Sequence, residues 1–208
     1  HIITPEAAKA WVDANTLTIV CDTHRQEMVA APEALEISER RIVIDHHRRA
    51  ADFVENPLLT YLEPTASSTS ELVTELVQYI EDDVRINKLT AEGLLAGISL
   101  DTKNFAFKTG VRTFEAASYL KKSGADTIEV KKLFNSDIKD FITKAEIIQN
   151  AKVINNNICL AYTKTETDNI NIVIAQAADE LLNIKEVEAS FVLARKDDRV
   201  FISARSLG

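Results

Sequence analysis

Aspartate and histidine side chains recur in three short segments of the first half of the chain. These segments are Cys21-Asp22-Thr23-His24, Asp45-His46-His47-Arg48-Arg49 and Asp101-Thr102. Carboxylate oxygens combined with imidazole nitrogens suit Mn²⁺, Fe²⁺ or Zn²⁺, and an oxygen-rich set favours Mn²⁺ or Mg²⁺. The two adjacent arginines would add positive charge for a phosphate. The residue types therefore predict a divalent metal site that acts on a phosphorylated ligand.

Two of these segments directly follow predicted strands. Residues 17–21 and 41–44 are short, apolar and partly β-branched, as buried strands are, and each is followed by an aspartate. In open parallel α/β sheets, ligands gather beyond the carboxyl ends of the strands. A third aspartate follows a predicted helix. We therefore expect Asp22, Asp45 and Asp101 to approach one edge of a sheet.

The remaining elements fall into two patterns along the chain. In the first part, a strand over 58–62 accompanies helices predicted over 6–13, 71–81, 90–100, 112–122 and 126–134. After a long helix over 136–151, the order becomes β-β-α-β-β, over 152–154, 158–163, 170–182, 189–195 and 200–203, with an asparagine turn over 155–157. The predicted fold is α/β, with a parallel-sheet domain over 1–135, a connecting helix over 136–151 and a smaller mixed α/β domain over 152–208.

The composition excludes several classes of protein. The net charge of −8, from 24 Lys+Arg against 32 Asp+Glu, argues against a broad grip on long nucleic acid but is compatible with a small phosphorylated ligand. The two cysteines are too few for a disulfide framework and favour a reducing compartment. Because no apolar run approaches the roughly 20 residues that cross a bilayer, we expect no membrane contact by this segment.

In their order along the chain, these segments resemble motifs of the DHH phosphoesterase superfamily. The tripeptide Asp45-His46-His47 follows an Ile-Val-Ile strand, with Asp-Thr-His upstream and Gly97-Ile98-Ser99-Leu100-Asp101-Thr102 downstream. Further similar segments lie at 63–69, 109–114, 174–179 and 202–208. The whole set is similar to the GdpP-type cyclic-di-AMP phosphodiesterases, which have a DHH domain followed by a DHH-associated C-terminal domain.

The resemblance implies a two-metal phosphodiesterase. It makes Asp22, His46 and Asp101 metal ligands, with Asp22 bridging the two ions. It implies Mn²⁺ as the cofactor, two ions per intact site, with Mg²⁺ or another divalent ion as the alternative. His47 takes the place of a substrate-facing catalytic histidine, and Asp45 supports it from behind.

Substrate binding is expected from positively charged side chains. Arg205 and Ser206 match a Ser-x-Arg-Ser element of the family's C-terminal domain, although an arginine at a strand end often only pairs with a carboxylate. Arg48 and Arg112 are further cations that could neutralise the diester or its product. His24 fits either a substrate contact or a hydrogen bond within a turn.

The expected activity is hydrolysis of cyclic-di-AMP to the linear dinucleotide pApA by a metal-activated water. The alternatives are an oligoribonuclease or a 3′-phosphoadenosine phosphate phosphatase of the same superfamily, or a non-catalytic nucleotide-sensing module. The family's first metal motif, His-x-x-x-Asp-x-Asp, and its Gly-Gly-Gly-His segment do not occur in the sequence, so we expect a fragment with little or no activity of its own. The resemblance further implies a cytoplasmic domain of a membrane-anchored bacterial protein, acting as a homodimer on a cyclic dinucleotide.

Overall fold

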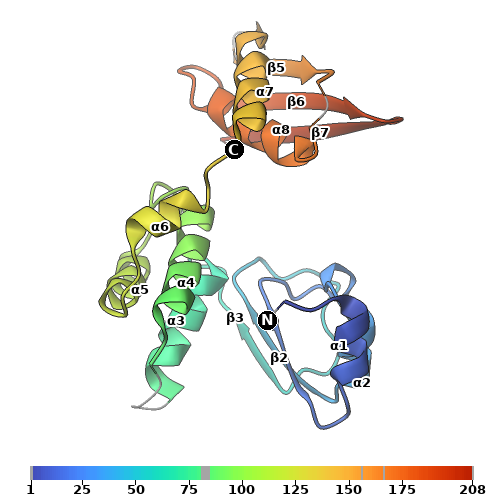
Figure 1. Cartoon of the computed structure of the whole chain (residues 1–208), viewed down its shortest axis with the longest axis vertical. Coiled ribbons are helices and arrows are strands. Elements are labelled where there is room, and N and C mark those ends of the chain that lie inside the picture. Colours follow the sequence, from blue (N-terminus) through green and yellow to red (C-terminus); the bar gives the residue numbers. More distant parts are fainter. Residues whose placement is uncertain (1, 81–84, 156, 166, 208) are drawn as a thin grey trace. The chain divides into compact units, whose positions relative to one another are not determined.

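The computed structural model describes residues 2–80, 85–155, 157–165 and 167–207. Three predicted segments, over 71–81, 155–157 and 202–208, each include a residue outside these ranges. The chain divides into two compact units, His1–Phe134 and Asn135–Gly208 (Figure 1). The first unit contains a parallel three-stranded sheet with helices and the second a mixed four-stranded sheet with helices, which confirms the predicted α/β fold.

The parallel sheet of the first unit positions the predicted metal ligands. Its strands β1 (Leu17–Cys21), β2 (Arg40–Asp45) and β3 (Leu59–Leu62) lie in the order β1-β2-β3. Cys21 pairs with Ile44, so β1 and β2 end side by side. The segments that follow these two strands therefore start at the same edge of the sheet.

Two short helices and a 3-10 turn surround the first strands. They are α1 (Pro5–Trp11), η1 (Gln26–Met28) and α2 (Pro32–Ile37). A small core forms where Leu35 of α2 meets Val20, Val43 and Val54, all of which are buried. This apolar cluster packs the strands β1 and β2, after which the candidate ligands Asp22 and His46 follow.

Four helices complete the first unit. They are α3 (Thr69–Ile80), α4 (Lys88–Asp101), α5 (Val111–Lys122) and α6 (Thr127–Lys132). The helix α4 packs against α3, α5 and α6, and α3 also contacts β2. Asn87 caps α4 by accepting a hydrogen bond from the Thr90 N–H. The last residue of α4 is Asp101, so packing among the helices decides where this carboxylate lies.

A close approach between α3 and α4 depends on a glycine. A Cβ added at Gly97 would lie 2.1 Å from Ser70 Oγ and 3.0 Å from Ser70 Cβ, whereas one at Gly93 meets no heavy atom of the described residues within 4 Å. We expect Gly97→Ala to lower the free energy of unfolding by about 1–3 kcal/mol through overpacking. Gly93→Ala, one turn earlier, should raise it by about 0.5–1 kcal/mol because alanine is the better helix former. Urea titrations of both variants test this, and equal effects would contradict it.

The second unit has a mixed sheet covered by helices. Its elements are α7 (Ile138–Gln149), β4 (Lys152–Ile154), β5 (Ile158–Thr163), α8 (Ile170–Leu182), β6 (Ala189–Lys196) and β7 (Arg199–Ser206). The sheet order is β4-β5-β6-β7, and only the central pair β5 and β6 is parallel. The helices α7 and α8 pack on each other, and Val173, Ala177 and Leu181 of α8 are buried in the core. The predicted connecting helix thus corresponds to α7, which belongs to this unit.

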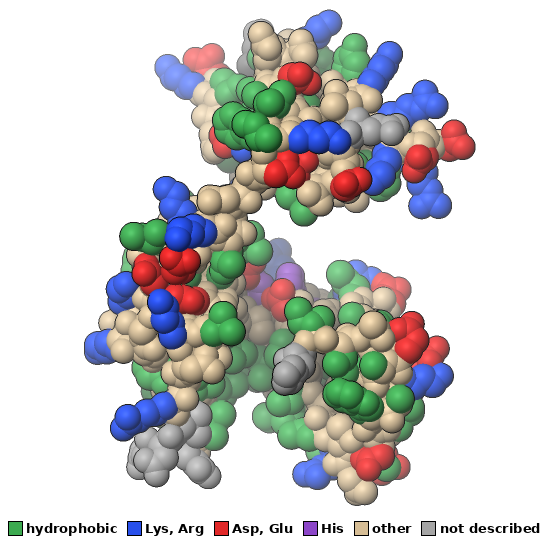
Figure 2. All heavy atoms as spheres, viewed as in Figure 1, with side chains coloured by type: hydrophobic (Ala, Val, Ile, Leu, Met, Phe, Trp, Pro, Cys, Tyr) green, Lys and Arg blue, Asp and Glu red, His purple; other side chains and the backbone are tan. Residues whose placement is uncertain are grey.

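The surface carries charges of both signs. On the face that Figure 2 shows, basic and acidic side chains are interspersed over both units. Among the described residues, none of the helices is long and apolar enough to cross a membrane.

Candidate metal centre

Asp22 leaves the end of β1 in an unusual backbone conformation. Its φ is 65°, in the left-handed region, while its N–H donates to the Ile44 carbonyl at 3.0 Å. A non-glycine residue in this region costs roughly 1–2 kcal/mol, and such residues cluster at functional sites. The turn presents the carboxylate at the sheet edge, with 59% of the side chain exposed.

His46 is the point at which three predicted ligands meet. Its Nε2 lies 3.6 Å from Asp22 Oδ1 and 3.7 Å from Asp101 Oδ2. These separations are long for hydrogen bonds. Two ligand atoms that each lie about 2.1 Å from one ion can be at most about 4.2 Å apart, so His46 is close enough to share a divalent cation with either carboxylate.

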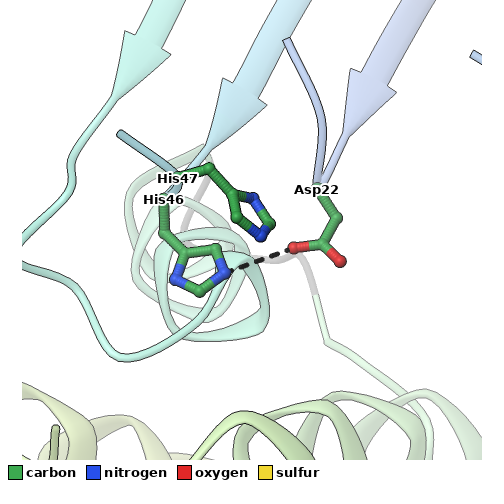
Figure 3. A group of neighbouring side chains, drawn as sticks. All are labelled: Asp22, His46 and His47. Atoms are coloured by element: carbon green, nitrogen blue, oxygen red, sulfur yellow. Dashed lines mark ion pairs between the residues drawn. The ribbon is translucent and has the colours of Figure 1, made fainter. Parts of the chain in front are cut away.

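His47 lies beside this pair. Asp22, His46 and His47 each offer a ligand atom, and these atoms are all within 4.8 Å of one another. Figure 3 shows the two imidazoles and the carboxylate converging from the ends of neighbouring strands, with the His46–Asp22 pair dashed. The donor set of carboxylate oxygen and imidazole nitrogen therefore fits a divalent metal ion.

Asp101 is the partly buried member of the cluster, with 32% of its side chain exposed. Burial raises the pKa of the Asp101 carboxyl above its ordinary value; His46 opposes this shift and the nearby Asp22 carboxylate adds to it. Two like charges brought together at the edge of a site are stabilised when a cation binds between them. The charges of Asp22 and Asp101 thus favour a bound cation, as the distances to His46 do.

Asp45 lies behind the histidines and is fully buried. Its Oδ1 accepts hydrogen bonds from the His46 N–H at 2.8 Å, the His47 N–H at 3.1 Å and His47 Nδ1 at 2.7 Å. Its Oδ2 faces His24 Nδ1 at 2.5 Å. Burial raises the pKa of this carboxyl, but the hydrogen bonds from His47 and His24 outweigh it and hold the pKa below its ordinary value. Asp45 is therefore an ionised carboxylate that holds the His47 ring at Nδ1 and the backbone N–H groups of both histidines.

Comparison with known proteins identifies the first part of the chain. Residues 2–98 match the DHH family, N-terminal domain. These residues form a DHH family domain. The resemblance predicted from the motifs is thereby confirmed.

Relatives with assigned activities are similar beyond the DHH domain. The chain is 46% identical over 211 residues to the cyclic-di-AMP phosphodiesterase GdpP of Bacillus subtilis (strain 168), with 100% of this chain and 32% of that protein covered. It is 27% identical over 162 residues to a probable manganese-dependent inorganic pyrophosphatase of Thermotoga maritima (strain ATCC 43589 / DSM 3109 / JCM 10099 / NBRC 100826 / MSB8), covering 77% of this chain and 28% of that one. The chain is homologous to GdpP over its full length and spans about a third of it.

A solved structure has a similar fold. It is the crystal structure of an exopolyphosphatase-related protein from Bacteroides fragilis, with a TM-score of 0.86 and 23% identity. The match covers 98% of this chain and 62% of that chain. At this identity the match shows the fold.

Among the predicted substrate cations of the first unit, Arg112 has the most contacts. Its Nε and Nη2 donate to the two carboxylate oxygens of Glu75 at 2.8 Å and 2.6 Å. This bidentate pair joins α5 to α3 and raises the pKa of the guanidinium. The structure thus engages Arg112 in helix packing, whereas Arg48 is exposed directly after the DHH tripeptide.

The other two predicted substrate residues belong to the second unit. Arg205 Nε donates to Asp179 Oδ1 at 3.1 Å, and its Nη1 donates to Ser203 Oγ at 3.2 Å. Ser206 is exposed at the end of β7. An ion pair with a carboxylate is the alternative that the sequence left open for this arginine.

The sequence interpretation did not predict the backbone conformation of the loop that follows Asp101. The Thr102 hydroxyl donates to the Ile98 carbonyl at 2.7 Å and accepts from the Phe105 N–H at 2.9 Å. Residues 103–105 all have positive φ values, between 49° and 64°. Three consecutive left-handed residues without a glycine give no composition signal, so the sequence marked Lys103-Asn104-Phe105 only as the continuation of the family-like segment that contains Asp101.

Proposed function

We propose that this chain forms part of a metal-dependent phosphodiesterase that hydrolyses cyclic-di-AMP to the linear dinucleotide pApA. The observation that carries the proposal is the placement of His46 Nε2 3.6 Å from Asp22 and 3.7 Å from Asp101. The 46% identity to a cyclic-di-AMP phosphodiesterase over the full chain supports the choice of substrate.

Asp22, His46 and Asp101 would hold a divalent ion, and Asp22 would bridge to a second. Mn²⁺ is supported by the mixed oxygen and nitrogen donors and by the manganese-dependent relative. When bound, a pair of such ions supplies a deprotonated water and neutralises charge on the attacked phosphate. With 59% of its side chain exposed, the Asp22 carboxylate would be accessible to a second ion, as the family resemblance implies.

His47 would face the substrate. Because its Nδ1 lies 2.7 Å from the Asp45 carboxylate, the ring donates from Nδ1, and in the neutral form Nε2 carries a lone pair. With 56% of its side chain exposed, that nitrogen can accept a hydrogen bond or a proton from water or from a substrate oxygen. Asp45 would keep a proton on Nδ1, so that the ring gains or loses its second proton at Nε2.

The phosphate and nucleotide contacts are proposed for four side chains, namely Arg48, Arg112, Arg205 and Ser206. Arg48 is exposed beside His47. Arg112 would have to exchange Glu75 for a ligand, and Arg205 would have to exchange Asp179. On the basis of the family resemblance, we also propose a homodimeric, membrane-anchored bacterial protein with this chain on the cytoplasmic side.

The substrate assignment can be tested with a panel of phosphate compounds. The full-length protein that carries this chain is incubated with Mn²⁺ in four separate reactions. Each reaction contains one compound: cyclic-di-AMP, 3′-phosphoadenosine phosphate, a short oligoribonucleotide or pyrophosphate. We expect pApA from cyclic-di-AMP as the main product, loss of turnover with a chelator and recovery with added Mn²⁺. The 208-residue chain alone should turn over little or nothing, since it has no His-x-x-x-Asp-x-Asp motif.

Each other outcome of the panel points to an alternative. Preferred cleavage of 3′-phosphoadenosine phosphate or the oligoribonucleotide would show that the proposed substrate is wrong, while metal-dependent hydrolysis would stand. Tight binding of cyclic-di-AMP without any product would support a nucleotide-sensing module and overturn the proposed enzyme.

A further inference from the structure

His24 is a buried histidine next to the metal centre but outside its ligand group. It follows Asp22 by two residues, and only 2% of it is exposed. Its ring lies against Phe53, with centroids 5.1 Å apart. This burial is incompatible with direct substrate contact, one of the two roles that the sequence left open. Burying an imidazole costs free energy unless its two nitrogens have hydrogen-bond partners.

Both ring nitrogens have such partners, and together they fix the proton. The Ala50 backbone N–H lies 2.9 Å from His24 Nε2. A backbone N–H can only donate, so Nε2 is an acceptor and carries no proton. The proton is therefore on Nδ1, which donates to Asp45 Oδ2 at 2.5 Å. The main chain of Ala50 thus sets the tautomer that His24 presents to Asp45.

The His24 bond holds one side of the Asp45 carboxylate. The other oxygen, Oδ1, accepts from His47 Nδ1 at 2.7 Å and from the N–H groups of His46 and His47. The χ2 torsion of an aspartate is broad in itself, which leaves the carboxylate free to turn wherever hydrogen bonds do not hold it. Bonds to both oxygens remove this freedom. The direction of the His47 ring consequently depends on the hydrogen bond between His24 and Asp45.

His24 also anchors the segment that carries the two histidines. Its ring accepts from the Ala50 N–H, and its carbonyl accepts from the Val54 N–H at 2.8 Å. Residues 46–54 are thereby tied to the chain that follows β1 at two points. The same region supplies Asp22, so His24 links the strand ends from which the candidate ligands come.

We propose that His24 is a positioning residue of the metal centre: it fixes the Asp45 carboxylate, through which His47 is held toward Asp22 and His46. The proposal deepens the proposed function and rests on that metal site. His24 does not take part in the chemistry, since it contacts the site only through Asp45.

Two substitutions separate the bond to Asp45 from the bond to Ala50. The side-chain amide nitrogen of asparagine overlays Nδ1, so His24→Asn keeps a donor toward Asp45 but cannot accept from the Ala50 N–H. The terminal amide of glutamine overlays Nε2, so His24→Gln keeps an acceptor for Ala50 and leaves Asp45 Oδ2 without its donor. Each variant loses one of the two hydrogen bonds, which makes them matched controls for stability.

The readouts are the Kd for Mn²⁺ by calorimetry on the 208-residue chain and the ¹⁵N shifts of the His47 ring in the metal-free chain. We expect His24→Asn to keep the Mn²⁺ affinity within about threefold and His47 protonated at Nδ1. His24→Gln should weaken Mn²⁺ binding roughly 10–100-fold, as loss of an outer partner does, because Asp45 Oδ1 also accepts from the N–H of the proposed ligand His46. The same substitution should shift the His47 ¹⁵N resonances toward a mixture of tautomers.

The outcomes are distinguishable. Wild-type values for His24→Gln in both measurements would overturn the positioning role, as would equal losses in the two variants that follow their melting temperatures. If His24→Gln does not fold, His24→Asn decides: wild-type Mn²⁺ affinity despite the lost Ala50 bond supports the proposal, and a loss overturns it. Failure of the wild-type chain to bind Mn²⁺, with the difference in His47 tautomer retained, would instead refute the metal site of the proposed function.

Discussion

Replacing His46 with alanine should remove Mn²⁺ binding by the chain and abolish hydrolysis of cyclic-di-AMP by the protein that carries it. His46 Nε2 is the atom that lies within 4 Å of both candidate carboxylates, 3.6 Å from Asp22 and 3.7 Å from Asp101. Without it, the ion loses its nitrogen ligand between the two oxygens. We expect the affinity to fall by more than the roughly 100-fold that loss of an outer partner can cost.

The fold should survive this substitution. His46 Nδ1 is buried and has no hydrogen-bond partner among the described residues. Removing the ring therefore leaves no buried polar group without its partner. Calorimetry with Mn²⁺, a thermal melt and a product assay measure the three consequences. Arg40→Ala is the control, because Arg40 is exposed at the opposite end of the same strand, and it should change none of them. Unaltered Mn²⁺ affinity in His46→Ala would mean that the ligand assignment is wrong.

The convergence of strand-end residues could be predicted from the sequence because it follows from topology. Two apolar runs that each stop at an aspartate predict parallel strands whose carboxyl ends share an edge, and the observed register pairs Cys21 with Ile44. Side chains directly after these strands, Asp22 and His46, then have little freedom to lie elsewhere. The apolar pattern of the sequence and the geometry of a parallel sheet therefore lead to the same position for these two side chains.

The position of Asp101 depends on contacts that no local pattern contains. The residue ends α4, and α4 is placed by packing on other helices, including the close approach at Gly97. Its inclusion in the predicted site rested on the family resemblance and on its place after a helix. In the structure, its Oδ2 lies 3.7 Å from His46 Nε2.

The predicted cations show where sequence reasoning is weakest. Arg112 was interpreted from its charge, yet its guanidinium is paired with Glu75. Arg205 likewise pairs with Asp179. The partners Glu75 and Asp179 are distant in sequence from these arginines and look like ordinary charged residues on a helix surface. The sequence alone therefore could not show how many arginines are free to bind a substrate phosphate. His24 was undecided for the same reason, since Asp45 and Ala50 become its partners only in the fold.

Asp45→Ala should be the most destabilising single substitution among the candidate site residues, lowering the free energy of unfolding by about 3–5 kcal/mol. Asp45 is fully buried, and removing one partner of a buried charge network typically costs this much. The alanine would leave His24 Nδ1–H and the N–H groups of His46 and His47 without their acceptor. Mn²⁺ affinity should fall as well, because the proposed ligand His46 loses the hydrogen bond that holds its backbone N–H.

Asp45→Asn separates the charge from the shape of this side chain. Its amide oxygen can still accept from the His46 and His47 N–H groups, but its NH₂ group would face His24 Nδ1–H, donor against donor. His24 cannot relieve the conflict by moving its proton to Nε2, because the Ala50 N–H already points there. The asparagine variant should therefore also be destabilised, by less than the alanine variant, and urea titrations measure both. Wild-type stability in Asp45→Asn would show that His24 can change its tautomer, and the fixed proton inferred for this network would be wrong.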